Sequence, residues 1–176
     1  YDREFEPHRA VRCRFRDAGH ILGSAIAEIW VTEKGTTRKL VFSGDLGQPG
    51  RPIVRDPTPI DSADVLVVES TYGDRAHEPG DPLTTLGDVI NRTAARGGTV
   101  VIPAFAVGRA QTLLYAIHLL KERGVIHHLP VYLDSPMAID ATRIYHTHRD
   151  EHRLTPEQCE AMCHAATIVN KPADSK

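Results

Sequence analysis

The feature that most constrains the fold of this chain is a change of pattern at Glu69. Before Glu69, short apolar or alternating runs are separated by Gly, Pro and Asp turns, which is typical of successive strands. The predicted strands are residues 11–15, 25–32, 39–43 and 65–68. Residues 25–31 and 65–68 are nearly all apolar, and we therefore expect these strands to be covered on both faces.

After Glu69 the apolar residues follow helical repeats, with short apolar runs between them. The predicted helices begin near Pro82, Arg109 and Met137, and the first two end near Arg96 and Arg123. The predicted strands are a buried one at 99–102 and another at 131–133. Strands alternating with helices favour a βαβα unit with a parallel sheet. We therefore predict an α/β fold with one domain over residues 1–78, a second over 79–176, and the seam at 79–82.

Charge excludes a strongly basic nucleic-acid-binding domain, because the net charge is -2 and the pI is near 6.6. Nucleic-acid binding would have to come from a local patch. One candidate is the set Arg9, Arg12, Arg14 and Arg16. The last three alternate with apolar residues of a predicted strand, so they lie on one face of it. We interpret them as a solvated outer face.

The cysteine content favours a reducing, cytoplasmic setting, because three cysteines are an odd number in no disulfide or zinc-ribbon spacing. No apolar run approaches 18 residues, so we predict no membrane span.

Three polar side chains lie at or just after predicted strand ends, each beside glycines: His20, Asp45 and Glu69. Strand ends of α/β folds collect functional groups, because the sheet holds the backbone while the loop stays accessible. Imidazole is a good Zn²⁺ ligand, and a carboxylate can bridge two ions. Each residue alone is more often structural, but the three together suggest a metal site.

Five segments carry a resemblance to a known family: residues 17–24, 43–45, 69–73, 103–111 and 133–138. They resemble, in the same order, motifs of the β-CASP family of metallo-β-lactamase-fold RNA-processing nucleases. Its members include the cleavage subunit of the pre-mRNA 3′-end machinery and bacterial and archaeal homologues. The resemblance implies part of a metallo-β-lactamase αββα sandwich, followed by a β-CASP α/β domain with a parallel sheet.

The resemblance also implies roles for single residues. His20 would bind one of two Zn²⁺ ions, Asp45 would bridge both, and Glu69 would orient a further ligand histidine. Asp45 and Glu69 would be the catalytic residues. Arg109 and Ser135 open two predicted helices, where exposed amides and positive charge favour an anion. The resemblance makes that anion a substrate phosphate.

Some family motifs are missing from this sequence. The His-x-His-x-Asp-His motif expected upstream of His20 and the later histidine motifs are not found. We therefore expect an internal segment of a longer protein, with too few ligands to be active alone. Residues 146–152 imitate the missing motif with one extra residue and are interpreted as a solvated helix end. Cys159, Cys163 and His164 are helix-spaced, and we favour a core or surface role over metal binding.

The predicted function is a zinc-dependent nuclease that hydrolyses RNA as an endonuclease, a 5′-exonuclease or both. Its expected partner is single-stranded RNA and not a membrane, and we allow for a homodimer. One alternative is a small-molecule hydrolase that uses the same His20 and Asp45. The long α/β segment after Glu69 argues against it. The other alternative is a non-catalytic RNA-binding scaffold that has lost its metals.

Overall fold

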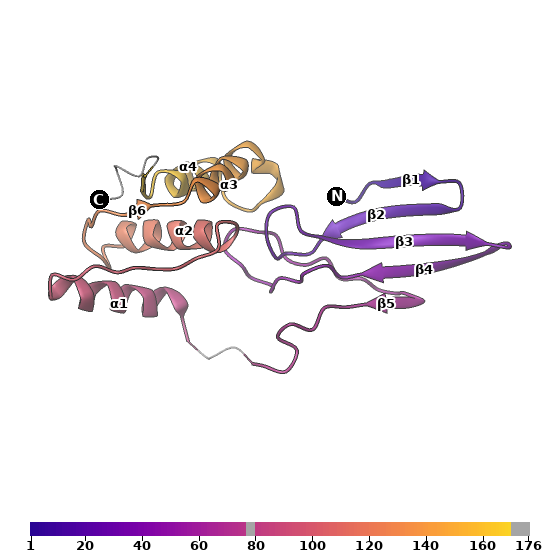
Figure 1. Cartoon of the computed structure of the whole chain (residues 1–176), viewed down its shortest axis with the longest axis horizontal. Coiled ribbons are helices and arrows are strands. Elements are labelled where there is room, and N and C mark those ends of the chain that lie inside the picture. The colour runs from indigo at the N-terminus through magenta and orange to yellow at the C-terminus, as the bar shows by residue number, and fades with distance from the viewer. Residues whose placement is uncertain (77–79, 170–176) are drawn as a thin grey trace. The chain divides into compact units, whose positions relative to one another are not determined.

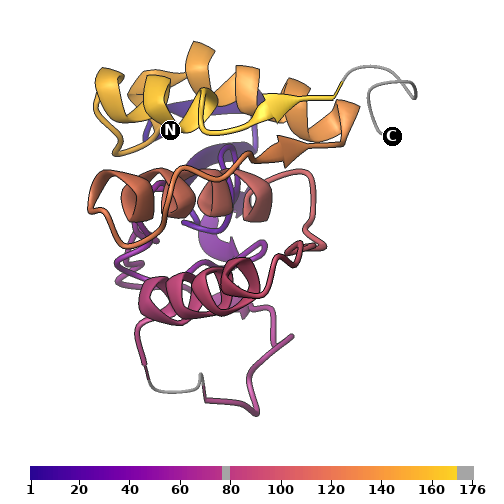
Figure 2. The same ribbon diagram turned by 90° about the vertical axis from the view of Figure 1, so that its left-hand side faces the viewer.

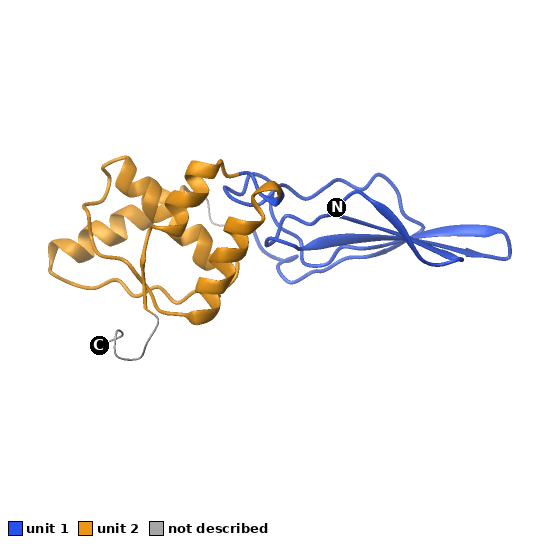
Figure 3. Cartoon of the chain, turned by 90° about the horizontal axis from the view of Figure 1, so that it is seen from above, with its two compact units in different colours: residues 1–76, 151–153 blue, residues 77–150, 154–176 orange. Residues whose placement is uncertain are grey.

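The computed structural model describes residues 1–76 and 80–169, and the chain divides into two compact units (Figure 3). Unit 1 comprises residues 1–76 and 151–153, and unit 2 comprises residues 77–150 and 154–176. The predicted domain boundary between residues 78 and 79, with Pro79 of the predicted seam, lies outside the described residues. That boundary stays a prediction.

Unit 1 contains a five-stranded sheet in the order β1-β2-β3-β4-β5 (Figure 1). Its strands are β1 (Glu4–His8), β2 (Val11–Asp17), β3 (Ala25–Glu33), β4 (Thr36–Phe42) and β5 (Val65–Val67). The first four strands pair antiparallel, whereas β4 and β5 pair parallel. Consequently β2, β4 and β5 run in one direction, and their carboxyl ends share one edge of the sheet. The four strands predicted before Glu69 are confirmed, while β1 was not predicted.

The strands of this sheet differ in how deeply their side chains are buried. Ile26 and Val41 form a buried cluster with Ala18, and Leu46 and Ile60 of the following loops pack against it. On β5 the side chains of residues 65–68 are 45–61% exposed. The expectation that residues 65–68 are covered on both faces is therefore wrong for this chain. The physical reason is that β5 is the last strand of the sheet, and the described part of unit 1 has no α-helix to cover it.

Unit 2 is mainly helical. Its helices are α1 (Pro82–Ala95), α2 (Arg109–Glu122), α3 (Pro136–Thr147) and α4 (Pro156–Cys163). A short 3-10 turn (Arg149–Glu151) follows α3, and its last residue belongs to unit 1. Figure 2 shows α2 between α1 and the α3–α4 pair, and α2 contacts all three. The core between α1 and α2 is built from Ile90, Ile117, Leu120 and Ile126. The three helices predicted from periodicity are confirmed.

Three of these helices begin with the same local chemistry, a polar cap followed by proline. The side chains of Asp81, Ser135 and Thr155 accept hydrogen bonds from amides of the first turns of α1, α3 and α4. Each cap satisfies a backbone donor that has no partner inside the helix. Proline tolerates the first helical position because no amide is needed there. The sequence therefore sets these helix starts locally.

The predicted buried strand at residues 99–102 is wrong. The segment has no strand assignment, and Val101 is 83% exposed. An apolar run forms a strand only beside another strand, and in residues 80–169 none pairs with this segment. The parallel sheet of unit 2 consists of β6 (Tyr132–Leu133) and β7 (Thr167–Ile168). Of the helices in the described residues, none is long and apolar enough to cross a membrane.

Candidate functional site

The loops after β2, β4 and β5 meet at the sheet edge where these strands end. The Gly47 amide in the second loop donates to the Ala18 carbonyl in the first, at 2.8 Å. The Ser43 amide donates to the Val67 carbonyl at 2.9 Å, which links the second loop to the end of β5. The predicted segments 17–24 and 43–45 are therefore linked to each other and to the end of β5, from which the chain enters the predicted segment 69–73.

Ser24 holds the first loop in a compact turn. Its hydroxyl accepts from the His20 amide at 3.1 Å and from the Ile21 amide at 3.2 Å, and it donates to the Ile21 carbonyl at 2.8 Å. The backbone on both sides of His20 is therefore fixed, while the His20 side chain is exposed. This arrangement presents an imidazole on a rigid loop.

Two glycines allow the loops to approach closely. A Cβ atom on Gly47 would overlap the Gly19 carbonyl oxygen, so no larger residue fits there. Gly44 has a φ of 57°, and a Cβ atom on it would lie 2.6 Å from the Ala25 carbonyl oxygen. Both the backbone conformation and the contact therefore favour glycine beside Asp45.

Glu69 ties the second and third loops together through its carboxylate. One carboxylate oxygen accepts from the Leu46 amide at 2.9 Å, and the other accepts from the Thr71 amide at 3.1 Å. Its own amide donates to the Ser43 hydroxyl at 3.0 Å. The hydrogen bond from Leu46, then those from Thr71, hold the pKa of Glu69 below its usual range, and His20 lowers it further. Glu69 is therefore an anion that fixes the backbone next to Asp45.

His20, Asp45 and Glu69 thus lie on three connected loops, with His20 and Asp45 exposed and Glu69 half-buried. Within residues 1–76 and 80–169, they do not form a three-ligand group with donor atoms within 4.8 Å of one another. In the part of the chain that the structure describes, a group of three ligand residues within this distance is found in unit 2, at His146, Cys159 and Cys163. The structure therefore brings together the loops expected of the site, but not a closed metal cage.

The helix starts that carry Arg109 and Ser135 differ in the groups they leave available. At α2, the amides of Gly108, Arg109 and Ala110 donate to Gln111 Oε1 and to backbone carbonyls. These amides are therefore already paired, contrary to the expectation that they face an anion, and only the exposed Arg109 side chain is left for that role. At α3, Ser135 Oγ accepts from the Ala138 amide at 3.2 Å. Its hydroxyl proton remains available for a further acceptor.

Comparison with known proteins identifies the group to which these elements belong. A model of the Beta-Casp domain matches residues 110–176. A ribonuclease of Thermus thermophilus is 39% identical over 137 residues, which cover 77% of this chain and 30% of the relative. The chain therefore contains a Beta-Casp domain.

Two further relatives extend the comparison. An RNase J-like protein of Methanocaldococcus jannaschii is 37% identical over 139 residues, 77% of the β-CASP chain and 32% of the relative. Cleavage and polyadenylation specificity factor subunit 3 of Dictyostelium discoideum is 33% identical over 147 residues, 80% of the chain and 18% of the relative. The chain therefore spans a third or less of the length of these relatives.

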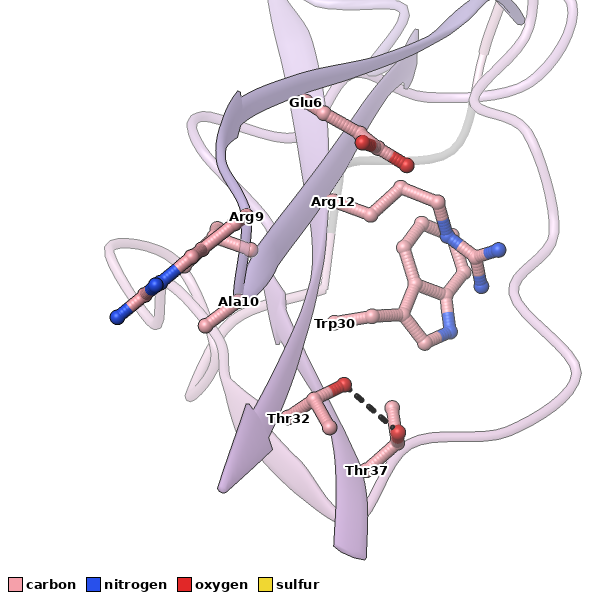
Figure 4. A pocket seen from close by; sticks show the side chains of 8 residues that line it. Glu6, Arg9, Ala10, Arg12, Trp30, Thr32 and Thr37 are labelled. Atoms are coloured by element: carbon pink, nitrogen blue, oxygen red, sulfur yellow. Dashed lines mark hydrogen bonds between the residues drawn. The ribbon is translucent and has the colours of Figure 1, made fainter. Parts of the chain in front are cut away.

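The arginine patch of the β-CASP chain lies around Trp30 on the sheet of unit 1. Arg12 stacks on the Trp30 ring at 4.7 Å from its centre, whereas Arg9 points away from it (Figure 4). Arg14 also approaches this ring, and its Nε lies 2.7 Å from a carboxylate oxygen of Glu28. The prediction of one face for Arg12, Arg14 and Arg16 is confirmed by their register with β3.

The patch is not simply solvated, because its charges are partly buried and largely neutralised. Glu28 is 2% exposed, and its carboxylate also lies 2.6 Å from Lys39 Nζ. Arg12 Nε lies 3.4 Å from a carboxylate oxygen of Glu4. The adjoining pocket of about 180 Å³ is lined by Glu6, Arg9, Arg12 and Trp30 together with Thr32 and Thr37. We therefore interpret this sheet face as one that stabilises the fold and not as a nucleic-acid-binding surface.

Sequence reasoning missed Glu28 and Gln111 of the β-CASP chain. A carboxylate inside an apolar strand was the available signal for Glu28, because a buried charge needs partners. Gln111 had a weaker signal, since a glutamine at the third helical position can cap the helix start. Both form hydrogen bonds with residues that lie far from them in the sequence, Glu28 with Arg14 and Gln111 with Ala138.

Proposed function

We propose that this chain contributes part of the active site of a metal-dependent nuclease that hydrolyses phosphodiester bonds of single-stranded RNA. The observation that carries the proposal is the meeting of three loops at one sheet edge, with His20, Asp45 and Glu69 on them. Relatives named as a ribonuclease and as a cleavage and polyadenylation specificity factor subunit support RNA as the substrate.

The residues present fit zinc as a partial ligand set. His20 and Asp45 offer an exposed imidazole and an exposed carboxylate on loops held by backbone hydrogen bonds. These donor types suit Zn²⁺, and we propose two ions in the intact protein, with Asp45 shared between them. Zinc would supply acidity to a bound water and positive charge beside the scissile phosphate. The remaining ligands would come from other segments of the intact protein.

Glu69 acts in this proposal as a positioning residue. Its carboxylate holds the amide that directly follows Asp45, and its lowered pKa keeps it ionised at neutral pH. Fixing the backbone beside Asp45 limits the positions its side chain can take. Such supporting contacts to a ligand are worth about 10–100-fold in metal affinity or activity.

Substrate phosphates would be held by residues of unit 2. Arg109 is exposed at the start of α2, and Ser135 keeps a hydroxyl proton at the start of α3. A guanidinium and a hydroxyl are suitable donors for phosphate oxygens. Because the amides at the start of α2 are paired, we propose the Arg109 side chain, and not the helix start itself, for this role.

The test compares the intact protein carrying Asp45→Ala with a matched control, Asp61→Ala, in which an exposed aspartate of the loop before β5 is removed. Zinc content and cleavage of a 5′-labelled single-stranded RNA are measured for each. We expect two zinc ions in the wild type, loss of cleavage in Asp45→Ala, and wild-type cleavage in Asp61→Ala. The ladder of products then separates endonuclease from 5′-exonuclease action.

Other outcomes favour the alternatives. Zinc bound without RNA cleavage in the wild type supports a small-molecule hydrolase, because His20 and Asp45 would serve that reaction too. Neither zinc nor cleavage supports an RNA-binding scaffold. Equal losses in Asp45→Ala and Asp61→Ala would mean that the assay reports folding, and would remove the support for Asp45.

A further inference from the structure

A second group of metal-ligand side chains lies in unit 2, on α3 and α4. His146 is in the last turn of α3, and Cys159 and Cys163 are four residues apart on α4. Residues four apart lie on the same face of a helix. One ligand atom from each of the three residues lies within 4.8 Å of the other two.

The two thiols contact each other, and each also has a weak carbonyl partner. Cys159 Sγ lies 3.9 Å from the Tyr145 carbonyl, and Cys163 Sγ lies 4.0 Å from the Thr142 carbonyl. Both cysteines are free, so no disulfide occupies the sulfur atoms. Thiol donors at such distances contribute little, and the packing of α3 against α4 therefore leaves both sulfurs available for a stronger ligand.

The burial of the group is graded from the core to the solvent. Cys159 is 0% exposed, Cys163 is half-buried, and the His146 side chain is 46% exposed. An ion would therefore reach the group from the solvent past the exposed His146 side chain. It would then bind the less exposed sulfur atoms of Cys163 and Cys159. This arrangement differs from a surface cluster, in which all ligands are solvated and mobile.

A redox or nucleophilic role for the thiols fits less well. Burial, with the neighbouring Cys159 and Glu160, raises the pKa of Cys163 to about 12, and burial also raises the pKa of Cys159. A reactive cysteine requires a thiolate, which is scarce in such surroundings. A metal ion would displace the thiol protons, so its binding would release protons and would tighten as the pH rises.

We propose that His146, Cys159 and Cys163 bind a thiophilic metal ion of the Zn²⁺ class, with water as the fourth ligand. Tetrahedral bonds near 2.3 Å to sulfur place two sulfurs about 3.8 Å apart. The three ligand atoms already lie within 4.8 Å of one another, so reaching that spacing requires the two sulfurs to move closer by about an ångström at most. Rotation of the Cys163 side chain would supply such a movement, and the exposed His146 ring would turn toward the ion.

The charges around the group are balanced for a divalent cation. Two thiolates neutralise a divalent ion, and Arg149 lies 3.8 Å from a Glu160 carboxylate oxygen, so this pair neutralises itself. Arg149 also contacts the His146 ring at 2.8 Å and 2.9 Å. Metal binding therefore requires Arg149 to shift from the ring toward Glu160, where it already has a partner.

The test uses Co²⁺ as a probe, because only a thiolate ligand produces an intense near-ultraviolet charge-transfer band with it. The chain is kept reduced and titrated with Co²⁺, and the band is recorded. The group at His20, Asp45 and Glu69 has only nitrogen and oxygen donors, so its loading does not produce this band. The thiolate band therefore reports on the site at His146, Cys159 and Cys163 alone, whether or not the nuclease proposal is correct.

The expected result is a thiolate band that saturates at one Co²⁺ per chain. Cys163→Ser and His146→Gln should each lower the affinity on the order of 100-fold, because each removes one of three protein ligands. Cys13→Ser and His164→Gln are matched controls and should leave the band unchanged, since Cys13 lies in unit 1 and His164 lies outside the group. Circular dichroism checks that each variant is folded.

A second measurement does not depend on variants. Zn²⁺ should slow alkylation of Cys163 in the wild-type chain by about tenfold or more, because its sulfur would be coordinated. The proposal is overturned if no thiolate band forms, if the band is lost in Cys13→Ser but kept in Cys163→Ser, or if Zn²⁺ leaves the alkylation rate of Cys163 unchanged.

Discussion

At the scale of residues, the sequence predicts that charged and apolar side chains alternate along β2. It does not predict which residues pair with the charged side chains. Arg12, Arg14 and Arg16 lie on one face of the sheet, as the period-two pattern predicts. The pattern does not reveal that Glu28, on the neighbouring strand, is buried between Arg14 and Lys39. Strand register decides that contact, and register is a property of pairing and not of one strand.

Replacing Glu28 tests this buried ion group. Glu28→Gln keeps the size of the side chain but leaves Arg14 and Lys39 without their shared anion, and we expect a loss of about 2 kcal/mol of folding free energy. Glu33→Gln, at the exposed end of β3, should change stability by less than about 0.5 kcal/mol. Urea unfolding at neutral pH measures both. Equal stability of the two variants would show that the ion group contributes nothing net.

The same ion group predicts a pH dependence. Burial alone would raise the pKa of Glu28, but the hydrogen bonds from Arg14 and Lys39 outweigh it and hold the pKa below the ordinary value of 4.5. A folded-state pKa below the unfolded one stabilises the fold above pH 4.5, and the contribution is lost as the pH falls through the folded value. The difference in urea midpoint between wild type and Glu28→Gln should therefore shrink below pH 4.5.

At the scale of elements, the three predicted helices and all predicted strands except the one at 99–102 are confirmed. The helix starts at Pro82, Pro136 and Pro156 follow capping side chains that act over two or three residues. Local signals of this kind are present in the sequence itself. The apolar run at 99–102 has no comparable signal, because its structure depends on whether another strand lies beside it.

Gln111 connects two of these helices, and its replacement should loosen them. Its side chain accepts from Gly108 and donates to the Ala106 and Ala138 carbonyls and to Thr142. Gln111→Leu leaves several buried polar groups unpaired, for which we expect a loss of about 3 kcal/mol.

Gln158→Leu is the matched control for Gln111→Leu. Gln158 also caps a helix start, because its side-chain oxygen accepts from the Thr155 amide at 3.0 Å. The control should therefore cost only about 1 kcal/mol. Thermal unfolding compares the two variants. A loss in Gln111→Leu no larger than that in the control would mean that the links from α2 to α3 do not stabilise unit 2.

At the scale of the whole molecule, each unit has a core of its own. The cluster around Ile26 and Val41 belongs to unit 1, and the one around Ile90 and Leu120 belongs to unit 2. Glu28→Gln should therefore speed amide hydrogen exchange in β2–β4 while α2 keeps its wild-type rates, and Gln111→Leu should have the opposite effect. Exchange followed by mass spectrometry measures this. Faster exchange throughout the chain in either variant would indicate one cooperative unit.

The sequence by itself determined the α/β class, the helix starts and the loops that carry His20, Asp45 and Glu69, because periodicity, caps and glycine motifs act over a few residues. Only the tertiary structure decided which groups meet. It joined the Glu69 carboxylate to the amide after Asp45, placed Glu28 between two cations, and brought His146 to Cys159 and Cys163. The physical reason is that such contacts depend on strand register and helix packing, which arise between segments distant in the chain.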